Sequence, residues 1–154
     1  MTQLAAPRQV QSEALCIAGV SHTYTFATAG GIPPQWMEFA PRIPELNAIG
    51  TDTFGVIHNP SETGMAYLSG VQMDPDSVPE ELVALTLPAA SYLVFNHPDN
   101  VASLSQTCEV IWMQWLPASE YEATGAPWFE RYGSQFDPIN GDGGLEVWIP
   151  VSPR

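Results

Sequence analysis

The chain has 154 residues, a hydrophobic share of 45% and a formal net charge of −13, which is typical of a folded globular domain kept in solution by its charge. Its four basic residues are scattered arginines, so we expect neither direct binding to nucleic acid nor binding to an anionic membrane. The acidic surplus also fits a cationic ligand or a basic partner.

The first half predicts the order strand, helix, strand, strand. The elements are a strand from about Gln11 to Phe26, a short helix over Ile32–Phe39, and two strands over Thr53–His58 and Met65–Val71 joined by the turn-rich segment from Asn59 to Gly64. Two prolines lie in the first turn of the helix, where a missing N–H costs little, and Pro41 and Pro44 end it.

The second half repeats this order. Its elements are a long strand from Leu82 to Phe95 bent near Pro88, a helix from Asp99 or Asn100 to about Leu116, and strands over Trp128–Tyr132 and Gly144–Val151. The apolar residues of the helix keep a three-four spacing, which turns one stripe toward a sheet. We therefore expect a single domain over residues 1–154, with internal repeats at about 10–75 and 80–152 and no DNA-binding domain.

The last strand alternates between two kinds of side chain. Leu145, Val147, Ile149 and Val151 fall on one face, which we interpret as core, whereas Glu146 and Trp148 share the other face. One interpretation of Glu146 is a carboxylate in water with no role. We favour a second interpretation, in which Glu146 lines a pocket roofed by aromatic side chains and meets a flat organic cation.

Four runs of residues carry a resemblance to a known family. They are Leu87-Pro88-Ala89-Ala90-Ser91-Tyr92-Leu93-Val94-Phe95-Asn96-His97, Trp112-Met113-Gln114-Trp115-Leu116-Pro117-Ala118-Ser119, Phe129-Glu130-Arg131-Tyr132 and Glu146-Val147-Trp148-Ile149-Pro150-Val151. In this order they resemble the gyrase-inhibitor-like (GyrI-like) family, the effector-binding domain also found in AraC-type and MerR-type transcription regulators. The resemblance covers the chain from about residue 10.

The resemblance implies an α+β fold of two βαββ units in a pseudo-two-fold arrangement, the GyrI-like fold, with a central ligand cleft between them. In multidrug-sensing members an acidic residue among aromatics binds lipophilic cations, and the position that looks similar here is Glu146. Some stand-alone relatives hydrolyse cyclopropane-bearing natural products, and others are linked to gyrase protection.

The aromatic residues supply the remaining candidates for the ligand site. Trp115 lies on the helix stripe and is interpreted as core. The candidate ligand-binding residues beside Glu146 are Trp148, Trp112, Trp36, Tyr132, Tyr92 and Phe129. Glu130 is either a second acid in the same cleft or a surface acid paired with Arg131 or another group, and we prefer the ion pair.

The sequence shows no sign of a metal, a cofactor or a membrane anchor. Cys16 and Cys108 are too few for a disulfide framework and lack metal-ligand spacing. No run approaches the roughly 18 apolar residues that span a bilayer, and Met1 to Val10 does not resemble a secretory signal. We expect a cytoplasmic protein with inert core thiols, no metal and no cofactor.

Three functions remain open. The first is a small-molecule-binding domain that senses or sequesters hydrophobic or cationic ligands, with Glu146 as charge partner. The second is a hydrolase of strained electrophilic natural products that uses Glu146 catalytically. The third is an interaction protein with a protein partner such as a gyrase or a regulator.

Overall fold

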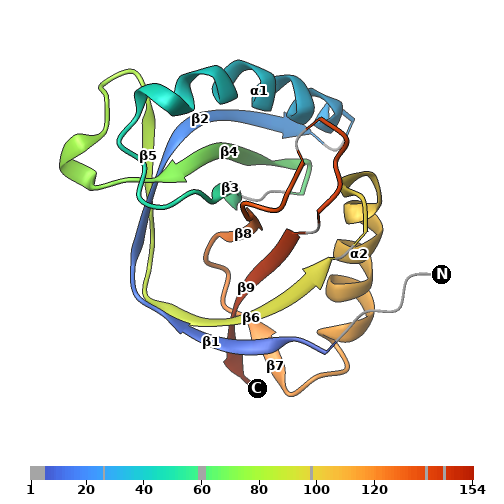
Figure 1. Ribbon diagram of the computed structural model, residues 1–154. Helices are drawn as coiled ribbons and strands as arrows, with labels where there is room; N and C mark the ends of the chain where they lie inside the picture. Colours follow the sequence, from blue (N-terminus) through green and yellow to red (C-terminus); the bar gives the residue numbers. More distant parts are fainter. Residues whose placement is uncertain (1–5, 26, 59–61, 98, 138, 144) are drawn as a thin grey trace.

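A single antiparallel sheet curls around a core and carries two short helices on its outer face (Figure 1). The structure is a computed structural model, described here for residues 6–25, 27–58, 62–97, 99–137, 139–143 and 145–154. The expected α+β class is confirmed. Phe26, Gly144 and part of the predicted turn after His58 lie outside the described residues.

The sheet has nine strands. They are β1 (Arg8–Ser12), β2 (Leu15–Thr25), β3 (Thr53–His58), β4 (Gly64–Gln72), β5 (Val83–Leu87), β6 (Ala90–His97), β7 (Tyr121–Ala123), β8 (Trp128–Tyr132) and β9 (Leu145–Pro153). The helices are α1 (Ile32–Phe39) and α2 (Leu104–Val110), and α2 continues as a π-helical turn, η5 (Ile111–Trp115). Short 3-10 turns lie at Ala29–Gly31, Ala40–Glu45, Pro75–Ser77 and Val101–Ser103.

The predicted repeat is present as β2–α1–β3–β4 and β6–α2–β8–β9. The strand order β1-β6-β9-β8-β3-β4-β2-β5 places β3-β4-β2 on one side of the centre and β8-β9-β6 on the other. The two units meet where β3 pairs with β8, so corresponding strands are related by a pseudo-two-fold through that ladder.

The two ends of this strand order are joined as well. β1 leads into β2 and β5 leads into β6, and the pairs from Arg8↔Val94 to Ser12↔Ala90 continue in the same register from Leu15↔Leu87 to Gly19↔Val83. Pro88, where the sequence predicted a bend, lies at the corner of this long ladder. The sheet therefore closes on itself and has an inner and an outer face.

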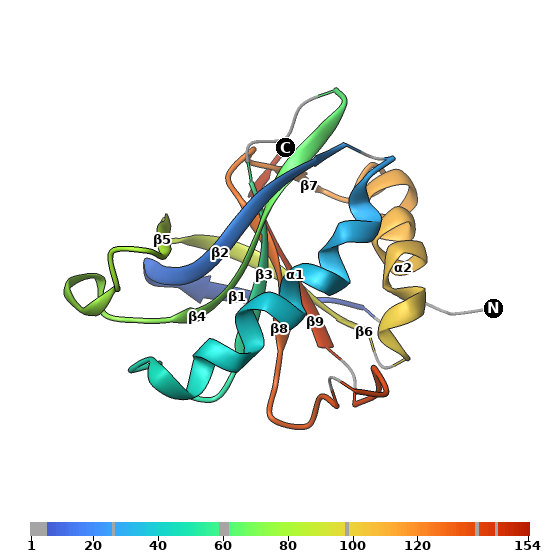
Figure 2. The same cartoon turned by 90° about the horizontal axis from the view of Figure 1, so that it is seen from above.

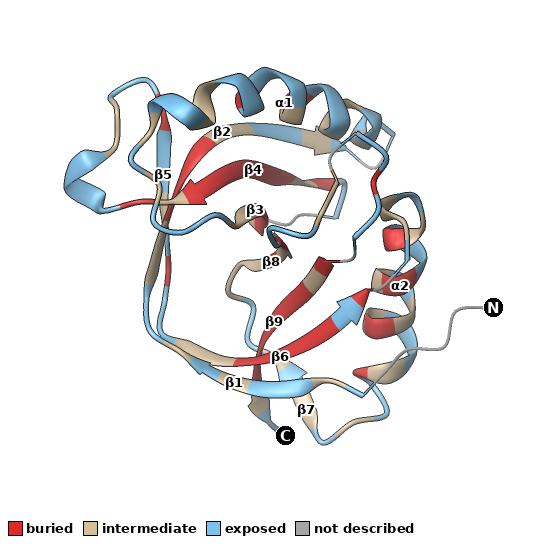
Figure 3. Ribbon diagram, viewed as in Figure 1, coloured by how far each residue is buried: buried red, intermediate tan, exposed pale blue. Residues whose placement is uncertain are grey.

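Each face has its own apolar core, and Figure 3 shows buried residues concentrated along β4, β6 and β9. The inner core consists of Ile17, Phe54, Val56, Leu68, Leu87, Tyr92, Val94, Phe129 and Trp148. The outer core lies under the helices, and its part beneath α2 contains the predicted core face of β9, namely Leu145, Val147, Ile149 and Val151. Both faces of β9 thus carry buried side chains.

Figures 1 and 2 show the two helices beside the same outer face of the sheet. α1 begins with prolines in its first turn, as predicted, and beyond Phe39 the chain continues as a 3-10 turn that tolerates Pro41 and Pro44. Asn100 caps the second helical segment, because its side chain accepts a hydrogen bond from the N–H of Ala102 at 2.9 Å. Within the described residues, no helix has the length and apolarity to cross a bilayer.

Candidate functional site

The central strand β8 places one acidic side chain among aromatic rings. Side chains alternate along a strand, so Phe129 belongs to the inner core while Trp128 and Tyr132 pack in the outer core under the helices. Glu130 shares the face of Trp128 and Tyr132. Its carboxylate therefore lies on the helix side of the sheet.

Two tyrosine hydroxyls bind one oxygen of this carboxylate. Tyr67 donates to Glu130 Oε1 at 2.8 Å and Tyr132 donates to the same atom at 2.6 Å. Trp36 Nε1 in turn donates to the Tyr67 hydroxyl at 3.1 Å. Glu130 Oε2 receives no hydrogen bond from the described residues, and it is not among their buried unpaired atoms. One carboxylate oxygen thus accepts two hydrogen bonds, and the other accepts none from the described residues.

The electrostatics of this cluster follow from its burial. Burial raises the pKa of Glu130 above its ordinary value, and the two tyrosine hydrogen bonds offset part of that rise. Burial and then the charge of Glu130 raise the pKa values of Tyr67 and Tyr132 well above the usual range, so both hydroxyls remain donors at neutral pH. No arginine or histidine of the described residues forms an ion pair with Glu130.

Aromatic rings from both helices surround the acid. Trp36 of α1 meets Tyr132 edge to face with 5.6 Å between ring centroids, and Tyr132 contacts Phe136 at 4.7 Å. Trp112 of η5 lies against Trp128 at 5.5 Å. The sequence-predicted residues Trp36, Trp112 and Tyr132 therefore come together, and they do so around Glu130.

A buried glutamine positions α1 and with it Trp36. Gln35 Nε2 donates to the carbonyl oxygens of Val20 and Tyr67 at 2.8 and 2.9 Å, and Gln35 Oε1 accepts from the Tyr24 hydroxyl at 2.5 Å. These bonds fix the helix to β2 and β4. The next residue, Trp36, is thereby held beside the Tyr67 hydroxyl.

The second helix is positioned by a polar pair and then changes its pitch. His97, at the end of β6, is buried and its Nδ1 lies 2.7 Å from Thr107 Oγ1 of α2. In the π-helical turn, the N–H of Leu116 donates to the carbonyl of Ile111, five residues back, at 2.8 Å. Such wider turns are frequent at functional sites. This turn sends Trp112 toward Trp128 and Trp115 toward Phe95.

Glu146 lies on the opposite face of the sheet, so the prediction that it shares a cleft with Trp36, Trp112 and Tyr132 is wrong. Glu146 lies directly opposite Arg131 in the register of the β8–β9 ladder. Its carboxylate forms an ion pair with Arg8 at 2.7 Å and accepts a hydrogen bond from Trp148 Nε1 at 3.0 Å. Its side chain is 29% exposed.

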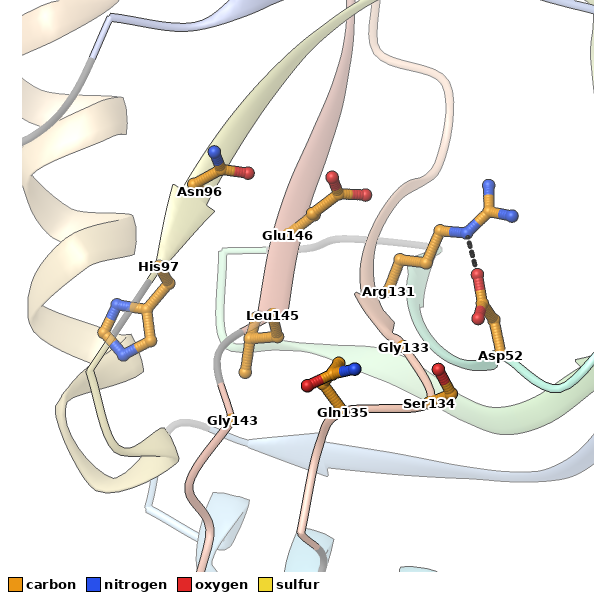
Figure 4. Close-up of a pocket in the computed structure, with 10 residues that line it drawn as sticks. All are labelled: Asp52, Asn96, His97, Arg131, Gly133, Ser134, Gln135, Gly143, Leu145 and Glu146. Carbon is orange, nitrogen blue, oxygen red and sulfur yellow. Dashed lines mark hydrogen bonds and ion pairs between the residues drawn. The ribbon is translucent and has the colours of Figure 1, made fainter.

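Glu146 lines an open hollow of about 510 Å³, and Figure 4 shows the side chains around it. The residues that line this hollow are Asp52, Asn96, His97, Arg131, Gly133, Ser134, Gln135, Gly143, Leu145 and Glu146. None of the described residues that line the hollow is a tryptophan, tyrosine or phenylalanine, and Arg131 and Asp52 are already paired within it at 2.7 Å. It therefore does not match the aromatic cleft that the sequence predicted.

Three further candidates belong to the inner core. Phe129 stacks on Trp148 with 5.3 Å between centroids, and Tyr92 meets both rings edge to face. Closure of the sheet buries this face, which explains why a tryptophan lies opposite the predicted core side of β9. Tyr92, Phe129 and Trp148 are therefore separated from the rings around Glu130 by the sheet itself.

The preferred interpretation of Glu130 as a surface acid paired with Arg131 is also wrong. The two side chains point to opposite faces of β8, and Arg131 pairs with Asp52 while its guanidinium lies over Phe54 and Trp148. The alternation itself was the signal, since Glu130 shares its face with Trp128 and Tyr132. The glycine in Phe54-Gly55-Val56 was a second signal, because a glycine inside a strand often marks a close approach by another group.

Comparison with known proteins decides the family. The model of the Cass2 family, described as "Integron-associated effector binding protein", matches residues 10–151. The chain belongs to this family. The resemblance to effector-binding domains of the GyrI-like type is thereby confirmed.

Two solved structures have a fold similar to that of this chain. The structure of SAV2435 bound to tetraphenylphosphonium has a TM-score of 0.78 at 20% identity, covering 96% of this chain and 94% of that one. An integron cassette protein from the mobile metagenome of Vibrio cholerae has a TM-score of 0.72 at 18% identity, covering 97% of each chain.

One protein with a similar sequence is a regulator. The transcriptional regulator BrlR of Pseudomonas aeruginosa is 24% identical over 150 residues, which are 94% of this chain and 54% of BrlR. The chain thus spans about half the length of that relative. None of these three proteins is described as acting on gyrase.

Proposed function

We propose that this effector-binding chain captures a hydrophobic, cationic aromatic small molecule between α1 and α2, with Glu130 as its charge partner. The observation that carries the proposal is a carboxylate that lacks a cationic partner among the described residues, has one free oxygen, and is surrounded by rings from both helices. A bound cation supplies the missing counter-charge.

The expected energetics favour a lipophilic cation of modest affinity. Opposite charges about 4 Å apart attract by roughly 4 kcal/mol at an effective dielectric near 20, and much of this is offset by desolvation. Each aromatic face adds on the order of 0.5–2 kcal/mol through cation–π contact. The rings of Trp36, Trp112, Tyr132 and Phe136 contact neighbouring rings, so a ligand must part them to bury its own surface.

The relatives support this assignment. SAV2435, whose fold is similar, has been described in complex with tetraphenylphosphonium, which is a lipophilic cation. BrlR is a transcriptional regulator, and this chain matches about half of it. We infer that ligand capture serves sensing or sequestration, and that any contact with DNA comes from another polypeptide segment.

The test compares two glutamates on opposite faces of neighbouring strands. Titration with tetraphenylphosphonium, followed by tryptophan fluorescence, measures the dissociation constant of wild type, Glu130→Gln and Glu146→Gln. We expect Glu130→Gln to weaken binding at least tenfold, about 1.4 kcal/mol, and Glu146→Gln to leave it unchanged. Circular dichroism establishes that all three proteins are folded.

Each alternative outcome has a definite meaning. Equal binding by wild type and Glu130→Gln would overturn the role of Glu130. Weakened binding in Glu146→Gln alone would move the ligand to the hollow on the other face of the sheet.

A further inference from the structure

The indole N–H of Trp112 is a buried donor without an acceptor. Among the described side chains, Trp112 Nε1 is the buried polar atom that lacks a hydrogen-bond partner. A buried donor left unpaired costs free energy, and most such groups in native proteins are paired. The unpaired N–H of Trp112 is therefore a feature to be explained by what the protein binds.

Trp112 lies next to the proposed ligand site. It follows Cys108 by about one helical turn, and the charge of Glu130 contributes, after burial, to raising the pKa of the Cys108 thiol to about 12. The Trp112 ring meets Trp128 edge to face, and Trp128 lies two residues from Glu130 on the same face of β8. The contact with Trp128 thus places the Trp112 ring on the helix side of β8, the side that carries Glu130.

The site consequently offers two unsatisfied groups of opposite kind. Glu130 Oε1 is saturated by two hydroxyls, which leaves Oε2 as a free acceptor that carries negative charge. Trp112 Nε1 is a free donor in an apolar environment. A ligand with a cationic centre alone satisfies only the first of these groups.

We propose that Trp112 is a specificity-determining residue that donates a hydrogen bond to an oxygen acceptor on the same ligand. This inference rests on the proposed function and narrows its ligand class to aromatic cations that also carry a carbonyl or similar neutral oxygen. The cation faces Glu130, and the oxygen faces Trp112. A cation without an oxygen acceptor also binds, but more weakly, because it leaves the N–H of Trp112 unpaired.

The test uses two phosphonium probes of the same shape. They are (4-acetylphenyl)triphenylphosphonium, which has a carbonyl oxygen, and (4-isopropenylphenyl)triphenylphosphonium, in which a CH2 group replaces that oxygen. Wild type should bind the acetyl probe about three- to tenfold more tightly, the range expected of one neutral hydrogen bond. Trp112→Phe, which keeps an aromatic ring and removes the N–H, should abolish this preference.

A neighbouring tryptophan supplies the matched control. Trp115 lies in the same π-helical turn but packs edge to face on Phe95 in the outer core, so Trp115→Phe should retain the preference for the acetyl probe. Calorimetric titration suits all variants, because it does not depend on tryptophan fluorescence.

Failure of this inference is distinguishable from failure of the proposed function. If wild type binds both probes equally, or if Trp112→Phe weakens both by the same factor, the N–H has no role in recognition and the inference is overturned, while the cation site stands. If wild type binds neither probe nor tetraphenylphosphonium, both proposals are overturned. Loss of the preference in Trp112→Phe alone supports the inference.

Discussion

Gly55 of β3 lies directly opposite Glu130 of β8 in the ladder that joins the two halves. A Cβ atom at Gly55 would lie 2.0 Å from the Tyr67 hydroxyl oxygen and 2.8 Å from Glu130 Oε1. The hydrogen-bonded pair therefore occupies the space that a side chain at residue 55 would fill. Glycine is required here by the close approach of other groups.

The first prediction concerns this glycine. Gly55→Ala should displace the Tyr67 hydroxyl from Glu130 and weaken tetraphenylphosphonium binding about tenfold or more, because two groups less than 3 Å from the new Cβ have to move. Fluorescence titration measures the affinity. Gly133→Ala is the matched control, since the nearest atom to a Cβ there is Asp52 Oδ1 at 4.0 Å. Equal affinities in the two variants would contradict the required contact.

The second prediction concerns the hydroxyl groups. Tyr132→Phe removes one of the two donors to Glu130 Oε1, and a hydrogen bond to a charged group contributes about 1.5–3 kcal/mol. The pKa of Glu130 should rise further, because its charged form loses a hydrogen bond. The cation should therefore bind more weakly, and the pH range over which its affinity increases should move to higher pH. Affinity measured across pH tests this. Tyr92→Phe, in the inner core, should leave the pH profile as in wild type.

The third prediction links Glu130 to stability. Its folded-state pKa is raised above the ordinary value of 4.5, so between the two values the folded protein holds a proton that the unfolded chain has lost. The stabilising contribution is therefore full below the unfolded-state pKa and is lost as pH rises through the folded-state pKa.

Urea unfolding of wild type and Glu130→Gln from acidic to neutral pH measures this contribution. The free energy of unfolding of Glu130→Gln relative to wild type should increase as the pH rises through this range. A difference that is constant with pH would show that Glu130 titrates as it does in the unfolded chain. Glu146→Gln provides the comparison for an acid on the other face.

The fourth prediction separates the inner core from the ligand site. Phe129 is fully buried against Phe54, Tyr92 and Trp148, so Phe129→Ala should destabilise the fold by about 3–5 kcal/mol. Trp148→Phe is the milder change and should lower the urea midpoint while tetraphenylphosphonium affinity stays constant. A tenfold loss of affinity in a fully stable Trp148→Phe protein would return Trp148 to the ligand site.

Local patterns were sufficient to predict most of the elements. The asparagine cap at Asn100, the prolines at the start of α1 and the period-two alternation of the strands each depend on neighbouring residues, and each is present in the structure. The strand β7 (Tyr121–Ala123) was not predicted, because three residues are too short for a period to appear. The order strand, helix, strand, strand in each half followed directly from these individual elements.

The site depended on information that alternation does not contain. A period of two sorts Glu146 and Trp148 from their neighbours, but it does not say which of the two faces carries the helices. Because the sheet closes, the face of β9 that carries Trp148 is part of a second core. Gln35 was missed for a related reason, since its partners Val20 and Tyr67 are distant in the sequence.

Successive side chains of β8 point to opposite faces of the sheet, so Glu130 lies on the helix side and Arg131 on the inner side. Variation among related chains can therefore proceed separately on the odd and even positions of this strand. New ligand preferences should arise from exchanges at residues 128, 130 and 132, whereas exchanges at 129 and 131 alter how firmly the sheet holds together. A library randomised at alternate positions would diversify recognition without dismantling the scaffold.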